Sequence, residues 1–454
     1  MSRSTFFEQL FDQLAERGRE FLGQGFGGQQ EGAEFISALS AQLLAQRGEA
    51  TAAALAQRLV DAFEDLDDDA RHKFFTFLAS ALNPDSDQVL AAAERYQADP
   101  SPEALATLGR ACEPPRQELF RRINMASGGT AMLVALRSAL LDQTAKYPEL
   151  RGVDDDLLHL FGSWFNRGFL TLQQIDWRTP AFLLEKLIAY ESVHEIQGWD
   201  DLRRRLEQDR RCFAFFHPAL IDEPLIFVEV ALVKGMATSV QSLLDTGQER
   251  VDPAKTDTAI FYSINNCQRG LRGVSFGNFL IKQVAADLKQ ELPNLKTFAT
   301  LSPVPGFRRW LSSDAVTAAA RISTDQSLVD KIALVQDETD WPKDPERSEM
   351  LREPILALAA HYLANAKQPD DRPIDPVARF HLGNGARLER VNWMADTSSN
   401  GIRQSGGVMV NYLYDLNDLE RNHEAYVNRK QVIAARRVEQ LAKDGTLLIN
   451  GSAS

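Results

Sequence analysis

Hydrophobic residues recur at helical spacing through roughly the first 170 positions of the chain. Phe6, Leu10 and Leu14 mark one amphipathic segment, and apolar residues with the same period run through 52–66 and 132–141. Almost nothing in this part alternates in the way that a half-buried strand does. The pattern predicts a helical bundle, and its simplest role is scaffolding or self-association.

After about residue 175 the pattern changes to short β-rich runs separated by turn signals. Residues 212–216 (CFAFF) and 225–232 (LIFVEVAL) are typical of buried strands. Further strands are expected at 260–264, 296–301 and within 408–416, and helices at 279–292, 314–320, 353–366 and 427–443. The sequence therefore predicts an α+β fold, with a helical-bundle domain over 1–173 and a mixed domain over 174–454.

Length and charge narrow the function. A chain of 454 residues is too long for one typical domain, so two or three are expected. The net charge is −13, from 50 basic and 63 acidic residues. Nucleic acid is therefore not expected as a partner, because phosphate backbones require a basic surface. The negative net charge does not exclude a small anionic ligand that a local arginine cluster binds.

The spacing of the cysteines and the two terminal segments indicate the cellular compartment in which the protein is expected. Cys112, Cys212 and Cys267 lie far apart without a CxxC pair, so we expect neither a zinc site nor a disulfide framework. No apolar run reaches the length of a membrane span. The N-terminal segment lacks the apolar core of a signal peptide, its acidic residues oppose a transit peptide, and no Ser-Lys-Leu address ends the chain. We expect a cytoplasmic protein without a membrane association.

A strand, a glycine-rich turn and a helix start follow one another between Ile260 and Lys282 (IFYSINNCQRGLRGVSFGNFLIK). Glycines let backbone N–H groups approach a phosphate, and a helix N-terminus favours negative charge. Three glycines and two arginines share this turn: Gly270, Gly273, Gly277, Arg269 and Arg272. The segment is a candidate pyrophosphate cradle.

Two better-known phosphate loops do not match this turn. No Gly-Lys-Ser/Thr closes it, and its glycines do not follow G-x-G-x-x-G. The spacing Arg272-x-x-Ser275-x-Gly277 resembles the CoA-pyrophosphate loop of GNAT acyltransferases, with Ser275 where that family has glycine. The alternative is a turn that only connects a strand to a helix.

Two further segments could carry chemistry. Ser302 follows a predicted strand in the stiff, proline-rich TLSPVPGF, although no G-x-S-x-G elbow surrounds it. His381 stands beside an Asn-Gly turn and could exchange a proton near neutral pH. A serine that merely ends a strand and a buried structural histidine are the alternatives. Tyr414 could place a phenol in a cleft, and His217, before Pro218, could line the same cleft. No histidine pair has a zinc-site spacing, so no metal is inferred.

Taken together, these blocks resemble the malonyl-CoA decarboxylase family. Four segments occur in the family's order and approximate spacing: HPALIDEPLIFVEVAL from His217, FYSINNCQRGLRGVSFGNFLIK from Phe261, TLSPVPGF from Thr300, and FHLGNGARLERVNWMAD from Phe380 followed by VNYLY from Val410. The resemblance covers most of the chain from about residue 175 and, less specifically, the helical region. Four blocks in order are far more specific than any one of them.

The resemblance implies a GNAT-like catalytic domain behind an oligomerising helical domain. It implies a lyase of fatty acid metabolism that converts malonyl-CoA to acetyl-CoA and CO₂, without a metal or an organic cofactor, as a homo-oligomer expected to be a tetramer. The family's catalytic serine falls on Ser302 and its catalytic histidine on His381, and a functionally sensitive tyrosine falls on Tyr414. Its substrate-binding loop falls on Arg272, Gly273, Val274, Ser275, Phe276, Gly277 and Asn278.

The chemistry is compatible with these residues. Loss of CO₂ from a malonyl thioester leaves an enolate-like oxyanion that needs hydrogen-bond donors, and the product then needs one proton. We expect His381 to orient or polarise the malonyl group and Ser302 to donate a hydrogen bond or relay the proton, with exchanged roles equally compatible. Two rivals stay open: a GNAT-type acyltransferase that passes the acyl group to an amine, and a non-catalytic CoA-binding scaffold.

Overall fold

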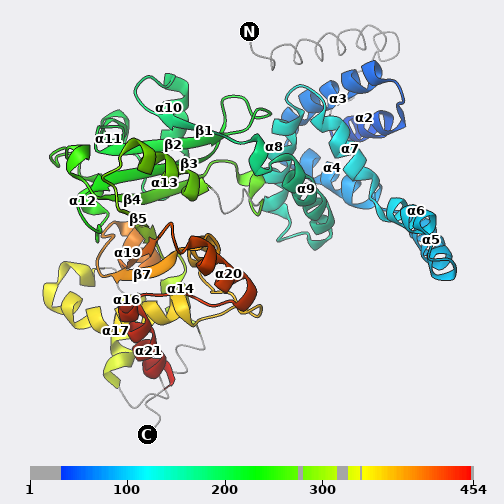
Figure 1. The fold of residues 1–454 in the computed structure, drawn as a ribbon. Coiled ribbons are helices and arrows are strands. Elements are labelled where there is room, and N and C mark those ends of the chain that lie inside the picture. Colours follow the sequence, from blue (N-terminus) through cyan, green and yellow to red (C-terminus); the bar gives the residue numbers. More distant parts are fainter. Residues whose placement is uncertain (1–31, 275–279, 314–325, 338–339, 451–454) are drawn as a thin grey trace. The chain divides into compact units, whose positions relative to one another are not determined.

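The computed structural model describes residues 32–274, 280–313, 326–337 and 340–450 (Figure 1). The predicted helices that start near Phe6 and over 314–320 therefore lie outside the described residues. The chain forms two compact units. The first comprises Met1–Thr171, Phe215–Leu225 and Asn266–Phe276, and the second comprises Leu172–Ala214, Ile226–Asn265 and Gly277–Ser454.

The described part of the first unit is helical up to residue 169, which confirms the expected helical N-terminal region. Side chains that cap the first turn fix several starts, as where Asp67 accepts from Ala70 N at 2.8 Å and Ser101 precedes Pro102 at a helix start. Two helices, α5 and α6, form a hairpin of their own (Figure 1). The helices are α2 Ala33–Ala45, α3 Glu49–Glu64, α4 Asp68–Ser80, α5 Ser86–Ala98, α6 Pro102–Cys112, α7 Pro115–Asn124, α8 Gly129–Gln143 and α9 Arg151–Trp164.

A mixed sheet, which lies mainly in the second unit, has the order β1-β2-β3-β4-β5-β8-β6, with β7 also paired to β8. The pair β4–β5 is parallel, whereas β5, β6 and β7 all run antiparallel to β8. The strands expected at 212–216, 225–232, 260–264 and 296–301 are confirmed as β2 to β5. The strands are β1 Thr171–Ile175, β2 Arg210–Phe216, β3 Pro224–Val233, β4 Thr258–Asn266, β5 Thr297–Thr300, β6 Ser302–Pro303, β7 Arg387–Asn392 and β8 Met409–Leu413.

Helices of the second unit surround these strands and correct one prediction. The single terminal helix expected over 427–443 is wrong: α20 ends at Arg429, Lys430 adopts φ 55°, and α21 starts only at Arg436. The residues between pair with β7, so backbone pairing competes with helix continuation there. The helices are α10 Ala181–Tyr190, α11 Trp199–Arg205, α12 Gln241–Leu244, α13 Leu280–Glu291, α14 Phe307–Leu311, α16 Gln326–Asp337, α17 Pro345–Ala364, α18 Pro376–Gly383, α19 Ser399–Ser405, α20 Leu419–Arg429 and α21 Arg436–Asn450.

Apolar strand residues pack into the core of the sheet. Ile260 and Tyr262 from β4, Ala299 from β5 and Met409 from β8 are buried in one cluster. Their alternation places every second residue of each strand on this side, as the period of a strand requires. Within the described parts of the chain, no helix combines the length and the low charge that a bilayer span needs.

Candidate active site

Strand β6 fixes the position of Ser302. This short strand follows β5 directly and pairs antiparallel with β8, where Ser302 lies opposite Val410. Pro303 and Pro305 remove backbone donors and restrict the turn that follows. The side chain of Ser302 is buried, with 6 % of the residue exposed. The serine therefore occupies a stiff and enclosed position.

His381 is positioned by the last turn of helix α18. Asp375 caps the start of this helix. Directly after the helix the chain turns, and Gly385 in this turn adopts φ +83°. A Cβ at Gly385 would lie 2.2 Å from the carbonyl oxygen of Leu419, so only glycine permits this approach to α20. The predicted Asn-Gly turn is thus the helix terminus that aims His381 inward.

A continuous hydrogen-bonded chain joins four side chains. Ser302 Oγ lies 3.0 Å from His381 Nε2 and donates to Thr300 Oγ1 at 2.8 Å. On the other side of the ring, His381 Nδ1 lies 2.8 Å from Tyr414 Oη. Thr300 Oγ1 also accepts from the backbone N–H of Tyr412 at 3.3 Å. Sequence reasoning named Ser302, His381 and Tyr414, and the structure brings all three together.

The pattern of partners assigns the protons in this chain. Ser302 Oγ donates its proton to Thr300 Oγ1, so it accepts from His381 Nε2. The neutral ring then accepts at Nδ1 from Tyr414, whose hydroxyl keeps its proton because burial raises its pKa well above the usual value. Complete burial lowers the pKa of His381 to about 3, so the imidazole is neutral at pH 7.

Aromatic rings enclose the histidine. The ring of Tyr412 stacks on that of His381, with centroids 4.5 Å apart and an angle of 25°, and Phe380 meets it edge-on. Tyr414 also meets the imidazole edge-on, with centroids 6.0 Å apart. These apolar faces explain the lowered pKa and hold the imidazole in one orientation. The cluster is neutral, buried and rigid, and it can donate hydrogen bonds and pass a proton.

The predicted substrate loop is described only in part. Ser275, Phe276, Gly277 and Asn278 lie outside the described residues. The described part belongs to the first compact unit: the side chain of Arg272 is exposed, Gly273 adopts φ +86°, and Val274 is buried.

Arg137 on α8 anchors this loop, a role that the sequence did not reveal. Its Nη1 donates to the carbonyl oxygens of Gly270 at 2.7 Å and Arg272 at 2.8 Å, and its Nε pairs with Asp154 at 2.7 Å. A Cβ at Gly270 would lie 1.9 Å from Val134 O, so the loop needs glycine where it meets α8. The lone arginine in an otherwise apolar helical pattern was the available signal.

Two other predicted residues have partners of their own. Arg269, expected as a cationic donor, pairs with Asp142, with Nη1 2.9 Å from its carboxylate. His217 accepts from Ala219 N at 3.1 Å and donates through Nε2 to Trp164 O at 3.1 Å. Burial lowers its pKa despite the bond to Trp164. These contacts belong to the first unit, and a substrate contact of His217 stays a prediction.

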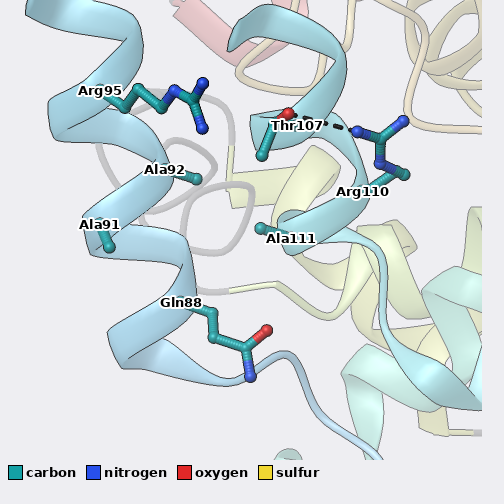
Figure 2. A pocket seen from close by; sticks show the side chains of 7 residues that line it. All are labelled: Gln88, Ala91, Ala92, Arg95, Thr107, Arg110 and Ala111. Carbon is teal, nitrogen blue, oxygen red and sulfur yellow. Dashed lines mark hydrogen bonds between the residues drawn. The ribbon is translucent and has the colours of Figure 1, made fainter. Parts of the chain in front are cut away.

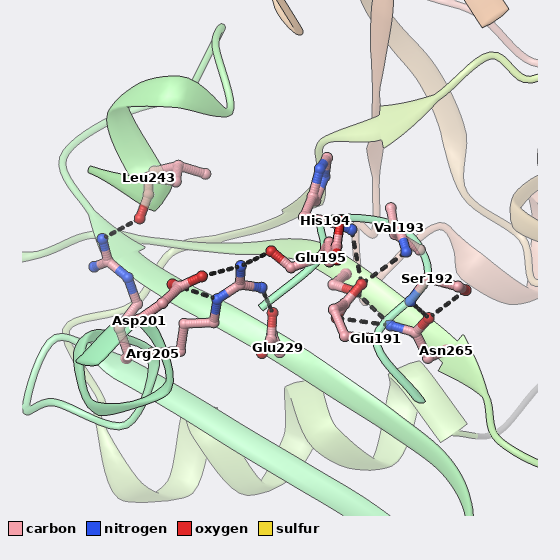
Figure 3. Close-up of polar contacts among 12 residues, drawn as sticks. Glu191, Ser192, Val193, His194, Glu195, Asp201, Arg205, Glu229, Leu243 and Asn265 are labelled. Carbon is pink, nitrogen blue, oxygen red and sulfur yellow. Dashed lines mark hydrogen bonds and ion pairs between the residues drawn. The ribbon is translucent and has the colours of Figure 1, made fainter. Parts of the chain in front are cut away.

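A second buried polar cluster occupies the second unit (Figure 3). Both carboxylate oxygens of Glu191 accept two hydrogen bonds each, from the N–H groups of Val193 and His194 and from the side chains of Ser263 and Asn265, at 2.7–2.8 Å. This arrangement ties the residues after α10 to the end of β4. Unlike the Ser302–His381 cluster, it is built around a charge.

An ion pair extends the second cluster. Arg205 donates to Asp201 at 2.9 Å and to Glu229 at 3.0 Å, and all three are largely or fully buried (Figure 3). Burial raises the pKa of Glu229 to about 7, against the opposing effect of Arg205. Among the residues that the structure describes, no group of three potential metal ligands comes together.

Comparisons with known proteins agree with the blocks in the sequence. The family model of the malonyl-CoA decarboxylase C-terminal domain matches residues 168–449, and that of the N-terminal domain matches residues 82–165. The mitochondrial malonyl-CoA decarboxylase of Anser anser anser is 37% identical over 347 residues, which cover 72% of this chain and 69% of that protein. The Rattus norvegicus protein of the same name is 34% identical over 354 residues, which cover 72% and 71%.

Solved structures give the same answer. The crystal structure of malonyl-CoA decarboxylase from Rhodopseudomonas palustris matches with a TM-score of 0.85 and 52% identity, covering 90% of this chain and 99% of that one. The structure from Agrobacterium vitis matches with a TM-score of 0.84 and 48% identity over the same shares. The match of both family models, the identity to the two mitochondrial relatives and the shared fold show that this chain belongs to the malonyl-CoA decarboxylase family.

Proposed function

We propose that this protein decarboxylates malonyl-CoA to acetyl-CoA and CO₂ and that Ser302 and His381 carry the reaction. The observation that supports this most is the neutral hydrogen-bonded chain from Tyr414 through His381 and Ser302 to Thr300, in a member of this family. Such a chain offers donors that are already oriented before the substrate arrives, which is the requirement for stabilising a developing oxyanion.

The reaction needs little more than these groups. The bond between the malonyl Cα and its carboxylate breaks, and its electron pair moves into the thioester to give an enolate with charge on oxygen. CO₂ leaves as a neutral molecule, and the enolate then takes one proton at Cα to give the acetyl thioester. The apolar, buried surroundings of His381 strengthen hydrogen bonds to that oxyanion, since they are not screened by water.

Neutrality constrains the roles of the two residues. With a pKa of about 3, His381 acts as a neutral imidazole and adds no positive charge. Its one N–H is donated to Ser302 Oγ in this structure, so the thioester oxygen takes the place of Ser302 when His381 polarises the substrate. Ser302 lies between this imidazole and Thr300 and can pass a proton along the chain. We propose that His381 orients and polarises the malonyl group while Ser302 supplies the hydrogen bond or relays the proton, with exchanged roles as the alternative.

Substrate binding is proposed for the loop from Arg272 to Asn278, including Gly273, Val274, Ser275, Phe276 and Gly277. The exposed guanidinium of Arg272 and the positive φ of Gly273 support a phosphate cradle that precedes helix α13. We propose that Tyr414 contributes to the reaction through its hydrogen bond to His381, and that His217 contacts the substrate.

The finer architecture is also a proposal. The parallel pair of β4 and β5, joined through the glycine loop and α13, supports a GNAT-like catalytic domain over 174–454. We assign the helical domain over 1–173 to self-association, with a tetramer as the expected assembly. The cytoplasm is the expected compartment, although relatives named as mitochondrial occur, so fractionation of the native host cells would decide it.

The direct test incubates the purified full-length protein with malonyl-CoA and follows both products by mass spectrometry. Equal amounts of acetyl-CoA and CO₂ without any added acceptor would support the proposal. Free CoA that forms only when an amine is added would favour an acyltransferase. Malonyl-CoA that binds and stays intact would favour a scaffold.

A further inference from the structure

A cavity of about 500 Å³ lies in the second unit between α17, β7 and α21, and no part of the proposed reaction uses it. Asn392 lines it, and the side chain of Asn392 contacts Asn411 on β8. The next residue of β8, Tyr412, stacks on His381. The lining includes four consecutive residues of β7, Glu389 to Asn392, but none of Ser302, His381 and Tyr414, so this cavity is separate from the candidate active site.

Three arginines from three different elements line the cavity: Arg352 from α17, Arg390 from β7 and Arg437 from α21. Among the described residues of the lining, Glu389 is the only acidic one, and its carboxylate already accepts from Arg387 at 2.7 Å. Arg352 pairs with Glu349 at 3.3 Å, so the excess positive charge of the cavity comes from Arg390 and Arg437, in a chain whose net charge is −13. Such a local excess of guanidinium groups favours a bound anion.

The start of helix α21 adds to this positive charge. Ala435, which lines the cavity, precedes the helix and has no side-chain oxygen to cap it. The first turn carries Arg436 and Arg437 together with one acidic residue, Glu439, so two cations stand where the macrodipole disfavours them. An anion bound at this helix start would satisfy both the N–H groups and the guanidinium groups.

The walls of the cavity are fixed. Leu388 N donates to Ile433 O, and Ala435 N donates to Leu388 O, both at 2.9 Å, which holds the start of α21 against β7. Further along, a Cβ at Gly445 would lie 2.2 Å from Ala357 O, so α21 and α17 pack with their backbones in close approach. A site with such walls is formed before a ligand arrives.

An unsatisfied buried acceptor gives independent support for a ligand. Asn411 Nδ2 donates to the carbonyl oxygens of Ala237 at 3.1 Å and Thr300 at 2.8 Å, which fixes its amide orientation. Asn392 must then donate its Nδ2 to Asn411 Oδ1, at 2.8 Å. Asn392 is 4% exposed, and its Oδ1 has no partner among the described residues. Such an orphaned acceptor is costly unless a donor reaches it.

We propose that this cavity binds a small phosphorylated molecule. Its phosphate lies against Arg390, Arg437 and the start of α21, and a hydroxyl or amine beside the phosphate donates to Asn392 Oδ1. The guanidinium fork matches a phosphate in geometry and charge. The inference does not depend on the proposed decarboxylase activity, because it concerns a cavity whose lining contains no residue of the Ser302–His381 cluster.

Titration calorimetry of the full-length protein with inorganic pyrophosphate tests the charge requirement. The double variant Arg390→Gln/Arg437→Gln is expected to weaken binding about tenfold or more, because two charged hydrogen-bond donors are lost. Both arginines are exposed, so the fold should survive, and thermal unfolding of each variant checks this.

Two control variants make the result specific. Arg272→Gln removes the cation of the glycine loop. Arg95→Gln/Arg110→Gln removes two arginines from the cavity of about 450 Å³ between α5 and α6, which Figure 2 shows. The proposal expects neither control to reduce the pyrophosphate affinity of the Arg390/Arg437 site. No binding, equal weakening in the α5–α6 control, or loss only with Arg272→Gln would each overturn it.

A pair of phosphate monoesters tests the part played by Asn392. Glycerol 3-phosphate carries hydroxyl donors, whereas methyl phosphate does not. Glycerol 3-phosphate is expected to bind more tightly to the wild type. Equal affinity, or tighter binding of methyl phosphate, would overturn the assignment of Asn392 as the ligand's acceptor.

Discussion

Two buried polar clusters in the same compact unit differ in charge. The chain of Ser302, His381 and Tyr414 is neutral, and each contact within it is a single hydrogen bond. The cluster around Glu191 and Arg205 is ionic, and these side chains make several hydrogen bonds each (Figure 3). Both are removed from water and both join several segments of the chain, but only the second cluster contains a buried ion pair.

This difference separates chemistry from stability. Removing one partner of a buried ion pair leaves an uncompensated charge, which strongly destabilises a fold. Removing one member of a neutral chain costs far less, because the desolvation of a hydroxyl or imidazole is smaller. We therefore expect the neutral cluster to control turnover and the ionic cluster to control folding.

The largest effect is expected in the neutral cluster. His381→Asn and Ser302→Ala should each lower kcat by about 10²- to 10⁴-fold, the usual range for a lost proton-transfer group. Steady-state assays with malonyl-CoA, together with CoA binding by calorimetry, measure this. Turnover within a few-fold of the wild type in either variant would show that the residue does not act in the reaction.

The next largest effect concerns folding. Arg205→Met leaves Asp201 and Glu229 buried without their cation and should lower the free energy of unfolding by about 3–5 kcal/mol. Urea denaturation followed by circular dichroism measures the change. The matched control is Arg178→Met, whose exposed pair with Asp176 should contribute nothing measurable. If both variants had a similar free energy of unfolding, the buried ion pair would not stabilise this protein more than the exposed one.

A smaller effect is expected from the tyrosine that orients the histidine. Tyr414→Phe removes the hydroxyl that donates to His381 Nδ1 and should lower kcat about tenfold, which corresponds to roughly 1.4 kcal/mol. The control is Tyr412→Phe, since the hydroxyl of Tyr412 has no hydrogen-bond partner among the described residues while its ring stacks on His381. Equal losses in both variants would argue against a specific role for the Tyr414 hydroxyl.

The smallest effect is a dependence of stability on pH. The pKa of His381 is about 3 in the folded protein and near 6.5 when unfolded, so only the unfolded chain binds this proton between those values. Stability from this residue is thus present above pH 6.5 and falls as the pH drops, by about 1 kcal/mol between pH 7.5 and 5.5. Glu229 and Asp375, whose pKa values are raised to about 7 and about 6, act in the opposite direction.

A difference measurement isolates the histidine from those carboxyl groups. The free energy of unfolding of the wild type minus that of His381→Asn should fall from pH 7.5 to 5.5. An unchanged difference would show that His381 titrates normally in the folded protein. Turnover should show no ionisation of His381 between pH 6 and 8.

The sequence predicted the strands that carry the site because their apolar runs are short and bounded by turn signals. It identified Ser302 and His381 only through the family's blocks, since the two residues lie 79 positions apart and neither has a local signature. The anchoring of Gly270 and Arg272 by Arg137 spans 133 and 135 positions, so the lone arginine in the apolar pattern of α8 could be noticed but its partners could not be predicted.

Other features also needed the tertiary structure. The contacts of Glu191 with Ser263 and Asn265 join residues more than 70 positions apart, and no sequence pattern near Glu191 predicts them. The break between α20 and α21 was missed because residues 427–443 read as one helix, whereas pairing with β7 interrupts it. Long-range partners, rather than local propensity, decide these cases.

The most direct test of the central claim measures kcat and the free energy of unfolding for His381→Asn and Arg205→Met side by side. We predict that His381→Asn loses turnover by at least about a hundredfold with an almost unchanged unfolding free energy. Arg205→Met should instead lose several kcal/mol of stability while its folded fraction keeps most of its turnover. The reverse pattern, or equal losses of both quantities in both variants, would contradict the separation of a neutral catalytic cluster from an ionic structural one.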